Sequence, residues 1–268
     1  NPKVLGDLQP YQKIIFQNLR NSYTIVEENT SIEFYFTGKE ALDSMYSSIE
    51  EARSHIHLQP YIIEQDRTGE RFAELLKKKA REGVEVRVIY DGVGCISLKK
   101  EFVQQMEQAG VEMLCFAKVT LPMPTSKVNY RNHRKILVVD GRTGFLGGVN
   151  IADRYYYGNE LGEWHDTHMK VTGETVASLQ TSFFLDRYFI LNRKIRRRKK
   201  YYPHPDIEKI GAEQTGKKIA VQTVASGPDS NWSSIMQCFF SAITLARKHI
   251  YIVSPYFTPN ESILNAIK

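Results

Sequence analysis

Hydrophobic and polar positions in the first half of the chain follow two alternating periods. Apolar side chains at Leu42, Met45, Tyr46 and Ile49 have the i, i+3, i+4, i+7 spacing of a helix with one buried face. Short apolar runs bounded by glycines and polar residues are typical of strands. The pattern predicts strands at 31–36, 55–63, 84–90 and 111–116, and helices at 40–53, 69–81 and 98–109. This alternation predicts an α/β layered domain.

The same helix-and-strand pattern returns 194 residues later. Pro60-Tyr61, at the end of the strand, also returns as Pro255-Tyr256, one residue further on. A helix stripe, a junction and a strand end that recur together indicate an internal duplication. At this offset Leu42, Met45, Tyr46, Ile49, Ala52, Arg53, His55 and Ile56 correspond to Met236, Phe239, Phe240, Ile243, Ala246, Arg247, His249 and Ile250.

The duplication predicts one full unit and the start of a second. We expect a lead-in at 1–28, a first unit at 29–192, a basic linker at 193–216, and an incomplete second unit at 217–268. A counterpart of His133 would fall at about position 328, beyond the last residue, Lys268. A site that needs both copies would therefore be present here only by half.

The formal net charge of +6 at pH 7 is concentrated in one run, residues 193–200, which has seven positive charges and no negative ones. Aromatic residues stand on both sides of it, at Tyr188-Phe189 and Tyr201-Tyr202. Basic and aromatic residues together suit an anionic membrane surface, and they equally suit nucleic acid. A solvated connector is the third interpretation. The cationic residues are Arg193, Lys194, Arg196, Arg197, Arg198, Lys199 and Lys200.

Two classes of protein are disfavoured by the remaining composition. No apolar run approaches the ~18–20 residues that a membrane-spanning helix needs. Cys95, Cys115 and Cys238 lie far apart without CxxC spacing, which argues against a disulfide framework or a thiolate zinc site. The cysteine pattern fits a reducing compartment.

Candidate chemistry lies in the stretch NHRKILVVDGRTGFLGGVN, residues 132–150. On a strand, His133 and Lys135 share a face and Arg134 points to the other side. A neutral histidine can act as nucleophile or proton carrier, and a lysine beside it supplies positive charge for an anion. The pair therefore predicts a site for a phosphate group. The following run 136–139 is typical of a strand buried on both faces.

Residues after this strand complete the predicted anion pocket. Gly147 and Gly148 have no side chains, so we expect an anion to approach backbone N–H groups there. Asn150 can donate its amide hydrogens. Asp140 has the opposite parity to His133, which favours a mainly structural role in a turn or ion pair. The set as a whole fits a phosphate diester.

The spacing HxKx4Dx6GGxN resembles the HKD motif of the phospholipase D superfamily, with every interval kept. The longer string NYRNHRKILVVDGRTGFLGGVNIADRY is similar to bacterial cardiolipin synthases, as are YDGVGC at 90–95 and WHDTH at 164–168. The resemblance covers about residues 29–268. It implies a mixed β-sheet flanked by helices, duplicated, with the second unit incomplete here. Members of this family carry two HKD halves and usually have membrane segments ahead of the first.

The resemblance also implies a mechanism. One histidine attacks phosphorus and forms a phosphohistidine, and the histidine of the other motif protonates the departing alcohol and then activates the acceptor. In a cardiolipin synthase, two molecules of phosphatidylglycerol give cardiolipin and glycerol. Neither a metal nor another cofactor is needed.

Carried to this chain, the resemblance makes His133 the catalytic histidine of the first half. It assigns Asp166 to orienting the histidine, with Glu160 and Glu163 as nearby alternatives. His165 and His168 would point to opposite faces of a strand, which argues against a shared metal. His55 and His249 fall at the repeated junction, where we expect a structural role. The predicted catalytic residues are His133, Lys135, Asp140 and Asp166, and the predicted phosphate-binding residues are His133, Lys135, Gly148 and Asn150.

Three functions remain open at this point. The first is a phosphatidyl transferase on the cytoplasmic face of the bacterial inner membrane, with phosphatidylglycerol and the second HKD half as partners. The second is a phospholipase D-type phosphodiesterase or endonuclease in which two chains form a homodimer. The third is a lipid-binding module or fragment without catalysis. The start of a second unit on the same chain favours the first, makes nucleic acid a less favoured partner, and predicts that this piece alone is inactive.

Overall fold

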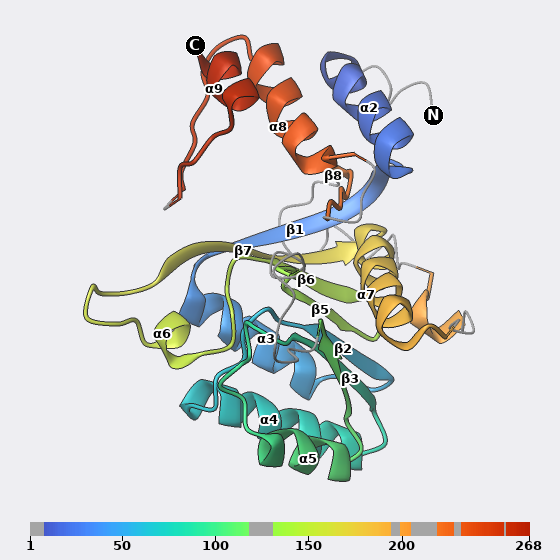
Figure 1. The fold of residues 1–268 in the computed structure, drawn as a ribbon. Coiled ribbons are helices and arrows are strands. Elements are labelled where there is room, and N and C mark those ends of the chain that lie inside the picture. The colour runs from blue at the N-terminus through green and yellow to red at the C-terminus, as the bar shows by residue number, and fades with distance from the viewer. Residues whose placement is uncertain (1–7, 118–130, 194–198, 205–218, 228–231, 255) are drawn as a thin grey trace. The chain divides into compact units, whose positions relative to one another are not determined.

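A computed structural model describes residues 8–117, 131–193, 199–204, 219–227, 232–254 and 256–268 (Figure 1). Their contacts form two units, Glu27–Val221 and the combination of Asn1–Val26 with Gln222–Lys268. The division of the chain that the repeat predicts stays a prediction. Of the cationic run, Lys194, Arg196, Arg197 and Arg198 lie outside the described residues.

The unit Glu27–Val221 is built on a sheet of eight described strands in the order β4-β3-β2-β5-β6-β7-β1-β8. The pairs β2–β3 and β3–β4 are parallel, and the other neighbouring pairs are antiparallel. The predicted α/β class with a mixed sheet is therefore confirmed. The strands are β1 (Glu27–Thr37), β2 (His55–Gln59), β3 (Glu85–Asp91), β4 (Glu112–Phe116), β5 (Ile136–Val139), β6 (Thr143–Gly147), β7 (His165–Gly173) and β8 (Ile219–Val221).

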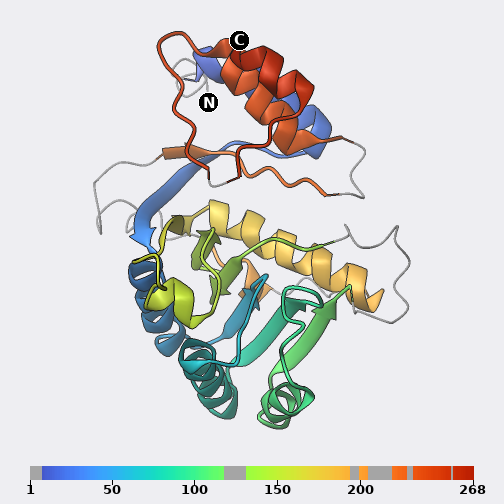
Figure 2. The same cartoon turned by 60° about the vertical axis from the view of Figure 1, so that its left-hand side comes forward.

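Helices cover both faces of this sheet. Figure 2 shows α7 on one face and α3, α4 and α5 on the other. The helix α3 begins with the N-cap residue Thr37, whose hydroxyl accepts a hydrogen bond from the Glu40 backbone N–H at 3.3 Å. Its predicted stripe, from Leu42 to Ile49, is buried. The helices are α3 (Gly38–Glu50), α4 (Arg67–Arg81), α5 (Lys100–Gln108), α6 (Asp153–Tyr156) and α7 (Thr175–Leu191), with a short 3₁₀ turn, η3 (Lys199–Tyr201).

The strand predicted at 55–63 ends earlier, at Gln59. Its last pairing is Gln59 with Ile136, the first residue of β5. Pro60 has no N–H with which to extend the ladder, so the two segments separate here. His133 and Lys135 consequently precede β5 in an irregular segment, and the prediction that they lie on a strand is wrong. All four residues of β5 are buried, as expected.

The unit formed by the two chain ends contains α2 (Gln12–Ser22), α8 (Ser234–Leu245), α9 (Glu261–Ile267) and a short 3₁₀ turn, η1 (Gln9–Tyr11). Helix α8 carries the repeated stripe, in which Ile243 is buried while Phe239 and Phe240 are exposed. Phe239 is 62% exposed and Ile252 is 49% exposed, while their counterparts Met45 and Leu58 are 5% and 2% exposed. The apolar pattern that packs against a sheet in the unit Glu27–Val221 therefore has no such sheet to pack against among the described residues of the unit formed by the chain ends.

None of the helices in the described ranges combines the length and the apolar character that crossing a bilayer requires. Cys95, Cys115 and Cys238 are free thiols.

Candidate active site

The segment that carries His133 leaves the sheet where β2 and β3 end and β5 begins. Two buried carboxylates accept hydrogen bonds from this segment. Asp91 accepts the Asn132 backbone N–H at 3.0 Å, and Asp186 of α7 accepts the Asn132 side-chain amide at 2.7 Å. Asp186 also accepts a hydrogen bond from Gln59 at 2.6 Å. The residue before His133 is thus fixed by both its backbone and its side chain.

The side chains of the motif alternate as the sequence predicts, although the segment is not a strand. The Arg134 guanidinium donates to both oxygens of Asp186, at 3.1 and 2.8 Å. Lys135 Nζ lies 3.1 Å from His133 Nδ1 and donates to the His133 carbonyl at 2.9 Å. Arg134 therefore anchors the segment to α7, while His133 and Lys135 meet each other.

Burial lowers the pKa values of both residues of this pair. It lowers the pKa of Lys135 to about 8, against the attraction of the Asp166 carboxylate, which raises that pKa. It also lowers the pKa of His133, with a further contribution from the Lys135 charge. Lys135 is 6% exposed and His133 is exposed. When Lys135 is charged, His133 Nδ1 accepts its hydrogen bond, and the proton of the neutral ring is then on Nε2. The site therefore holds an accessible imidazole beside an almost buried cation.

Asp166 is near this pair without bonding to His133 in the described part of the chain. The Asp166 Oδ1 atom accepts the Thr167 backbone N–H at 2.7 Å. Its carboxylate lies directly over Gly148, where an added Cβ would be 2.1 Å from Oδ1.

The glycine pair makes room for β7 in this structure. A Cβ on Gly147 would lie 2.5 Å from His168 Nδ1. The Gly148 N–H donates to the Thr167 carbonyl at 3.1 Å, so it is already occupied. The two glycines thus let the end of β7 approach closely enough to bring Asp166 toward Lys135.

Asn150 and Asp140 both hold backbone. The Asn150 amide, 3% exposed, accepts the Ile62 N–H at 3.1 Å and donates to the Tyr155 hydroxyl at 2.7 Å. Asp140 follows β5, at the opposite end from His133. Its backbone has φ 53°, and its carboxylate accepts the N–H groups of Arg53, Ser54 and His55 at 2.9, 2.8 and 2.9 Å. These contacts support the structural role expected for Asp140 from its parity.

His168 is a further buried group beside the site. It is 1% exposed, and its Nδ1 accepts the Val149 N–H at 3.4 Å. Its Nε2 has no hydrogen-bond partner among the residues that the structure describes. Burial, with a smaller contribution from the Lys135 charge, lowers its pKa to about 4. His168 is therefore neutral, and it lines a small cavity together with Lys135 and Pro60.

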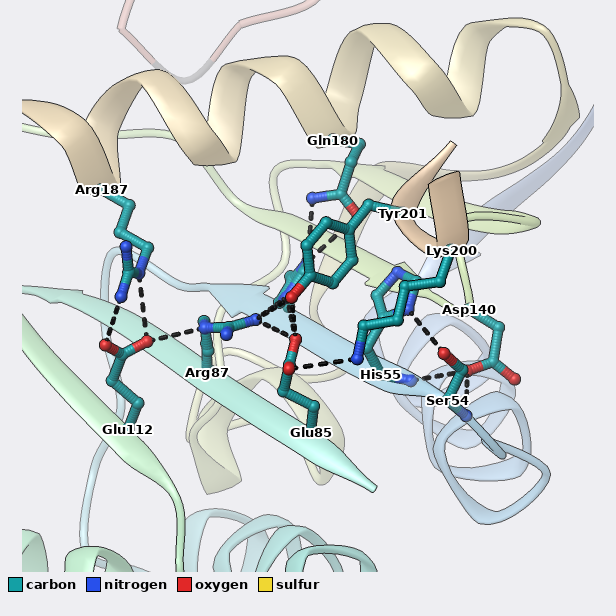
Figure 3. A network of polar contacts seen from close by, with 11 residues as sticks. Ser54, His55, Glu85, Arg87, Glu112, Asp140, Gln180, Arg187, Lys200 and Tyr201 are labelled. Atoms are coloured by element: carbon teal, nitrogen blue, oxygen red, sulfur yellow. Dashed lines mark hydrogen bonds and ion pairs between the residues drawn. The ribbon is translucent and has the colours of Figure 1, made fainter. Parts of the chain in front are cut away.

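A second polar cluster lies between α7 and the strands β2 and β3 (Figure 3). His57 contacts the Gln180 amide at 3.0 Å and the Arg87 guanidinium at 2.9 Å. Arg87 and Tyr201 both donate to the Glu85 carboxylate. Burial alone would raise the pKa of Glu85, but these bonds bring it to about 2. The cluster fixes the η3 turn onto β2 and β3.

His55 belongs to the same cluster and is fully buried, in agreement with the structural role expected from the repeat. Burial lowers its pKa to about 4, against the attraction of the Asp140 charge.

The sequence interpretation missed Asp91, Asn132, Asp186 and Tyr61 as parts of the site. Asp91 and Asn132 stand in the quoted strings YDGVGC and NYRNH, which was the available signal. Asp186 stands after the apolar run Phe183-Phe184-Leu185 of α7, where a buried carboxylate indicates a polar partner.

Comparison with known proteins gives consistent results. The family described as "Cardiolipin synthase, PLD-like domain" matches residues 45–183. A cardiolipin synthase of Geobacillus kaustophilus is 39% identical over 266 residues, 97% of this chain and 51% of the relative. One of Halalkalibacterium halodurans is 40% identical over 272 residues, 100% of this chain and 52% of the relative. The chain thus spans about half the length of the curated relatives it matches.

Among solved structures, the phosphatidylserine synthase of Haemophilus influenzae has a similar fold. The TM-score is 0.64, with 18% sequence identity over 95% of this chain and 62% of that chain.

Proposed function

This chain belongs to the cardiolipin synthase family of phospholipase D-like domains, and from that premise we propose that it forms one half of a phosphatidyl transferase. The proposed reaction joins two phosphatidylglycerol molecules and yields cardiolipin and glycerol. The observation that carries the proposal is the contact of 3.1 Å between Lys135 Nζ and the exposed His133 ring, with Arg134 anchored on the opposite side. This arrangement presents a nitrogen base and a cation together to a phosphate diester.

In the proposed first step, a histidine ring nitrogen attacks phosphorus. A nitrogen–phosphorus bond forms, the bond to the glycerol oxygen breaks, and the second histidine gives a proton to that oxygen. In the second step this histidine takes the proton of an acceptor hydroxyl, whose oxygen displaces the first histidine. Lys135 balances charge on the phosphoryl oxygens throughout. His133 fills either role.

Attack by His133 Nε2 would require its proton to move to Nδ1. Lys135 now occupies Nδ1 as a donor, so that nitrogen must first change partner. The Asp166 carboxylate is the nearby acceptor proposed for this purpose, since its charge already acts on Lys135. Proton transfer between ring nitrogens is thus coupled to the position of Asp166.

The second histidine is proposed to lie in a part of the protein beyond this half. Two facts support this: the chain spans about half the length of its relatives, and Phe239 and Phe240 of α8 are exposed together with residues 250–253. Uncovered apolar surface on this scale is typical of a missing partner layer. We therefore expect the 268-residue chain alone to have little transferase activity.

The proposed setting is the cytoplasmic face of a bacterial inner membrane. The cationic run supplies attraction to anionic lipid, and the end of α7 next to it exposes Leu185, Tyr188 and Phe189. Phosphatidylglycerol is itself anionic, so the same run would concentrate substrate near the site.

Replacement of His133 in the two-motif parent tests the proposal. Phosphatidylglycerol vesicles are incubated with wild type, His133→Ala, and a control, His204→Ala, whose ring is exposed and outside the motif. We expect His133→Ala to lose cardiolipin and glycerol release, and the control to keep both. Full turnover by His133→Ala would remove the residue from its proposed role.

The homodimeric phosphodiesterase is tested on this chain itself. The substrates are a nitrophenyl phosphodiester and DNA. Hydrolytic activity that is found in the dimer fraction after sedimentation, and that is lost in His133→Ala, would favour this alternative over the transferase.

A further inference from the structure

Tyr61 packs against both members of the His133–Lys135 pair. Its ring centroid lies 4.3 Å from that of the His133 ring, at an interplanar angle of 48°. Lys135 Nζ lies 5.1 Å from the Tyr61 ring centroid, within the range of a cation–π contact. One aromatic ring therefore touches the imidazole and faces the ammonium at the same time.

The surroundings of Tyr61 keep this ring in place. Its carbonyl accepts a hydrogen bond from the Cys95 thiol at 3.5 Å, and the next N–H, of Ile62, is held by Asn150. The turn after β3 is shaped to fit it, because a Cβ on Gly94 would lie 2.2 Å from the Tyr61 carbonyl and 3.1 Å from its ring. Pro60 restricts the backbone just before it. Tyr61 is therefore built into the site.

We propose that Tyr61 is a positioning residue for phosphoryl transfer, whose ring limits His133 to one orientation and holds the Lys135 ammonium beside it. The proposal rests on the proposed function for its catalytic consequence, while its structural part stands independently.

The chemistry of an aromatic ring suits this place. A carboxylate here would pair with Lys135 directly and compete with the phosphate for its charge. A ring face attracts the ammonium more weakly and bonds neither imidazole nitrogen. The ammonium thus loses no hydrogen to a carboxylate beyond those that it shares with His133, and the imidazole stays partly shielded from water.

The repeat extends the inference to the second half. Tyr256 is the sequence counterpart of Tyr61, at the end of the repeated strand pattern. It is 82% exposed here. We expect the same tyrosine–histidine pairing around the second motif of the parent protein.

Titration of His133 by NMR tests the positioning role in this chain without any need for activity. Burial lowers the pKa of His133, and the Tyr61 ring is part of what buries it. With selectively labelled histidines, wild type and Tyr61→Phe should both titrate below the ordinary histidine value. Tyr61→Leu, which lacks the flat ring, should titrate closer to that value. The exposed His204, which lies outside the motif, provides a control resonance in the same spectra.

The matching activity measurement uses the two-motif parent. Tyr61→Phe should stay within about threefold of wild type, while Tyr61→Leu should lose roughly 10- to 100-fold in kcat. The acid limb of its pH profile should shift upward, since a higher histidine pKa demands a higher pH for the neutral ring. An unchanged His133 titration in Tyr61→Leu, with a folded spectrum, would overturn the positioning role even if transfer is confirmed. A shifted titration with no transferase activity in any variant would uphold positioning and reject the proposed function.

Discussion

Replacement of Asp186 by asparagine should loosen the segment that presents His133. The carboxylate of Asp186 accepts four hydrogen bonds, one from Gln59, one from Asn132 and two from Arg134, between 2.6 and 3.1 Å. The side chain is 12% exposed, so solvent replaces few of these bonds. An asparagine keeps the shape but removes the charge and turns one acceptor into a donor that faces other donors.

The magnitude follows from these contacts. Hydrogen bonds to a charged group contribute about 1.5–3 kcal/mol each, and breaking a buried ion pair costs about 3–5 kcal/mol. Arg134 is 32% exposed, which reduces its share through solvent screening. We expect Asp186→Asn to lower the free energy of unfolding of the Glu27–Val221 unit by about 2–4 kcal/mol.

Urea unfolding followed by tryptophan fluorescence measures this change, because Trp164 lies in the same unit. The control is Glu74→Gln, which removes an ion pair whose carboxylate is 66% exposed and should cost about 0–1 kcal/mol. If Asp186→Asn unfolds within about 0.5 kcal/mol of wild type, the carboxylate does not hold the segment and the reasoning fails.

Three further predictions concern other parts of the molecule. Gly148→Ala should displace the Asp166 carboxylate, because its Cβ would meet Oδ1 at 2.1 Å. A crystal structure with Asp166 unmoved would contradict this. The free energy of unfolding should fall as the pH drops from about 6.5 toward 4. The pKa values of His55 and His168 are lowered in the folded protein, so the unfolded chain binds protons at a higher pH than the folded one. Each histidine contributes up to about 1.4 kcal/mol per pH unit. His168→Gln should flatten this dependence, and an equal slope would refute it. The third change replaces three arginines of the cationic run, Arg196, Arg197 and Arg198, with glutamine. It should weaken binding to anionic vesicles and reduce the salt dependence of that binding, measured by co-sedimentation. Unchanged binding would indicate that the run is only a linker.

Local periodicity was enough to locate most elements of the first unit. The helix at 40–53 is observed as Gly38–Glu50, and the strand at 84–90 as Glu85–Asp91. Both signals depend on residues a few positions apart, which a sequence displays directly. The strand at 55–63 was predicted too long, because the apolar run continues past Pro60 while the ladder does not.

Some features of the candidate site were likewise predictable from local sequence, and others were not. The pairing of His133 with Lys135 and the opposite direction of Arg134, toward Asp186, follow the predicted alternation even though no ladder forms there. The glycine pair was assigned to anion access, whereas its packing against Asp166 and His168 depends on how the end of β6 meets β7. Residue type indicated that a side chain was absent, but not which atoms fill the space.

The sequence by itself displayed the residues on which the proposed chemistry depends, a histidine, a lysine and a spaced glycine–asparagine extension, and it predicted the α/β class. The tertiary structure alone decided what holds them. Asp91 meets Asn132 across 41 positions, Asp186 meets Gln59 across 127, and Tyr61 reaches His133 from another strand end. Such contacts depend on strand order and on the packing of α7, which bring distant residues together at distances that no local spacing encodes.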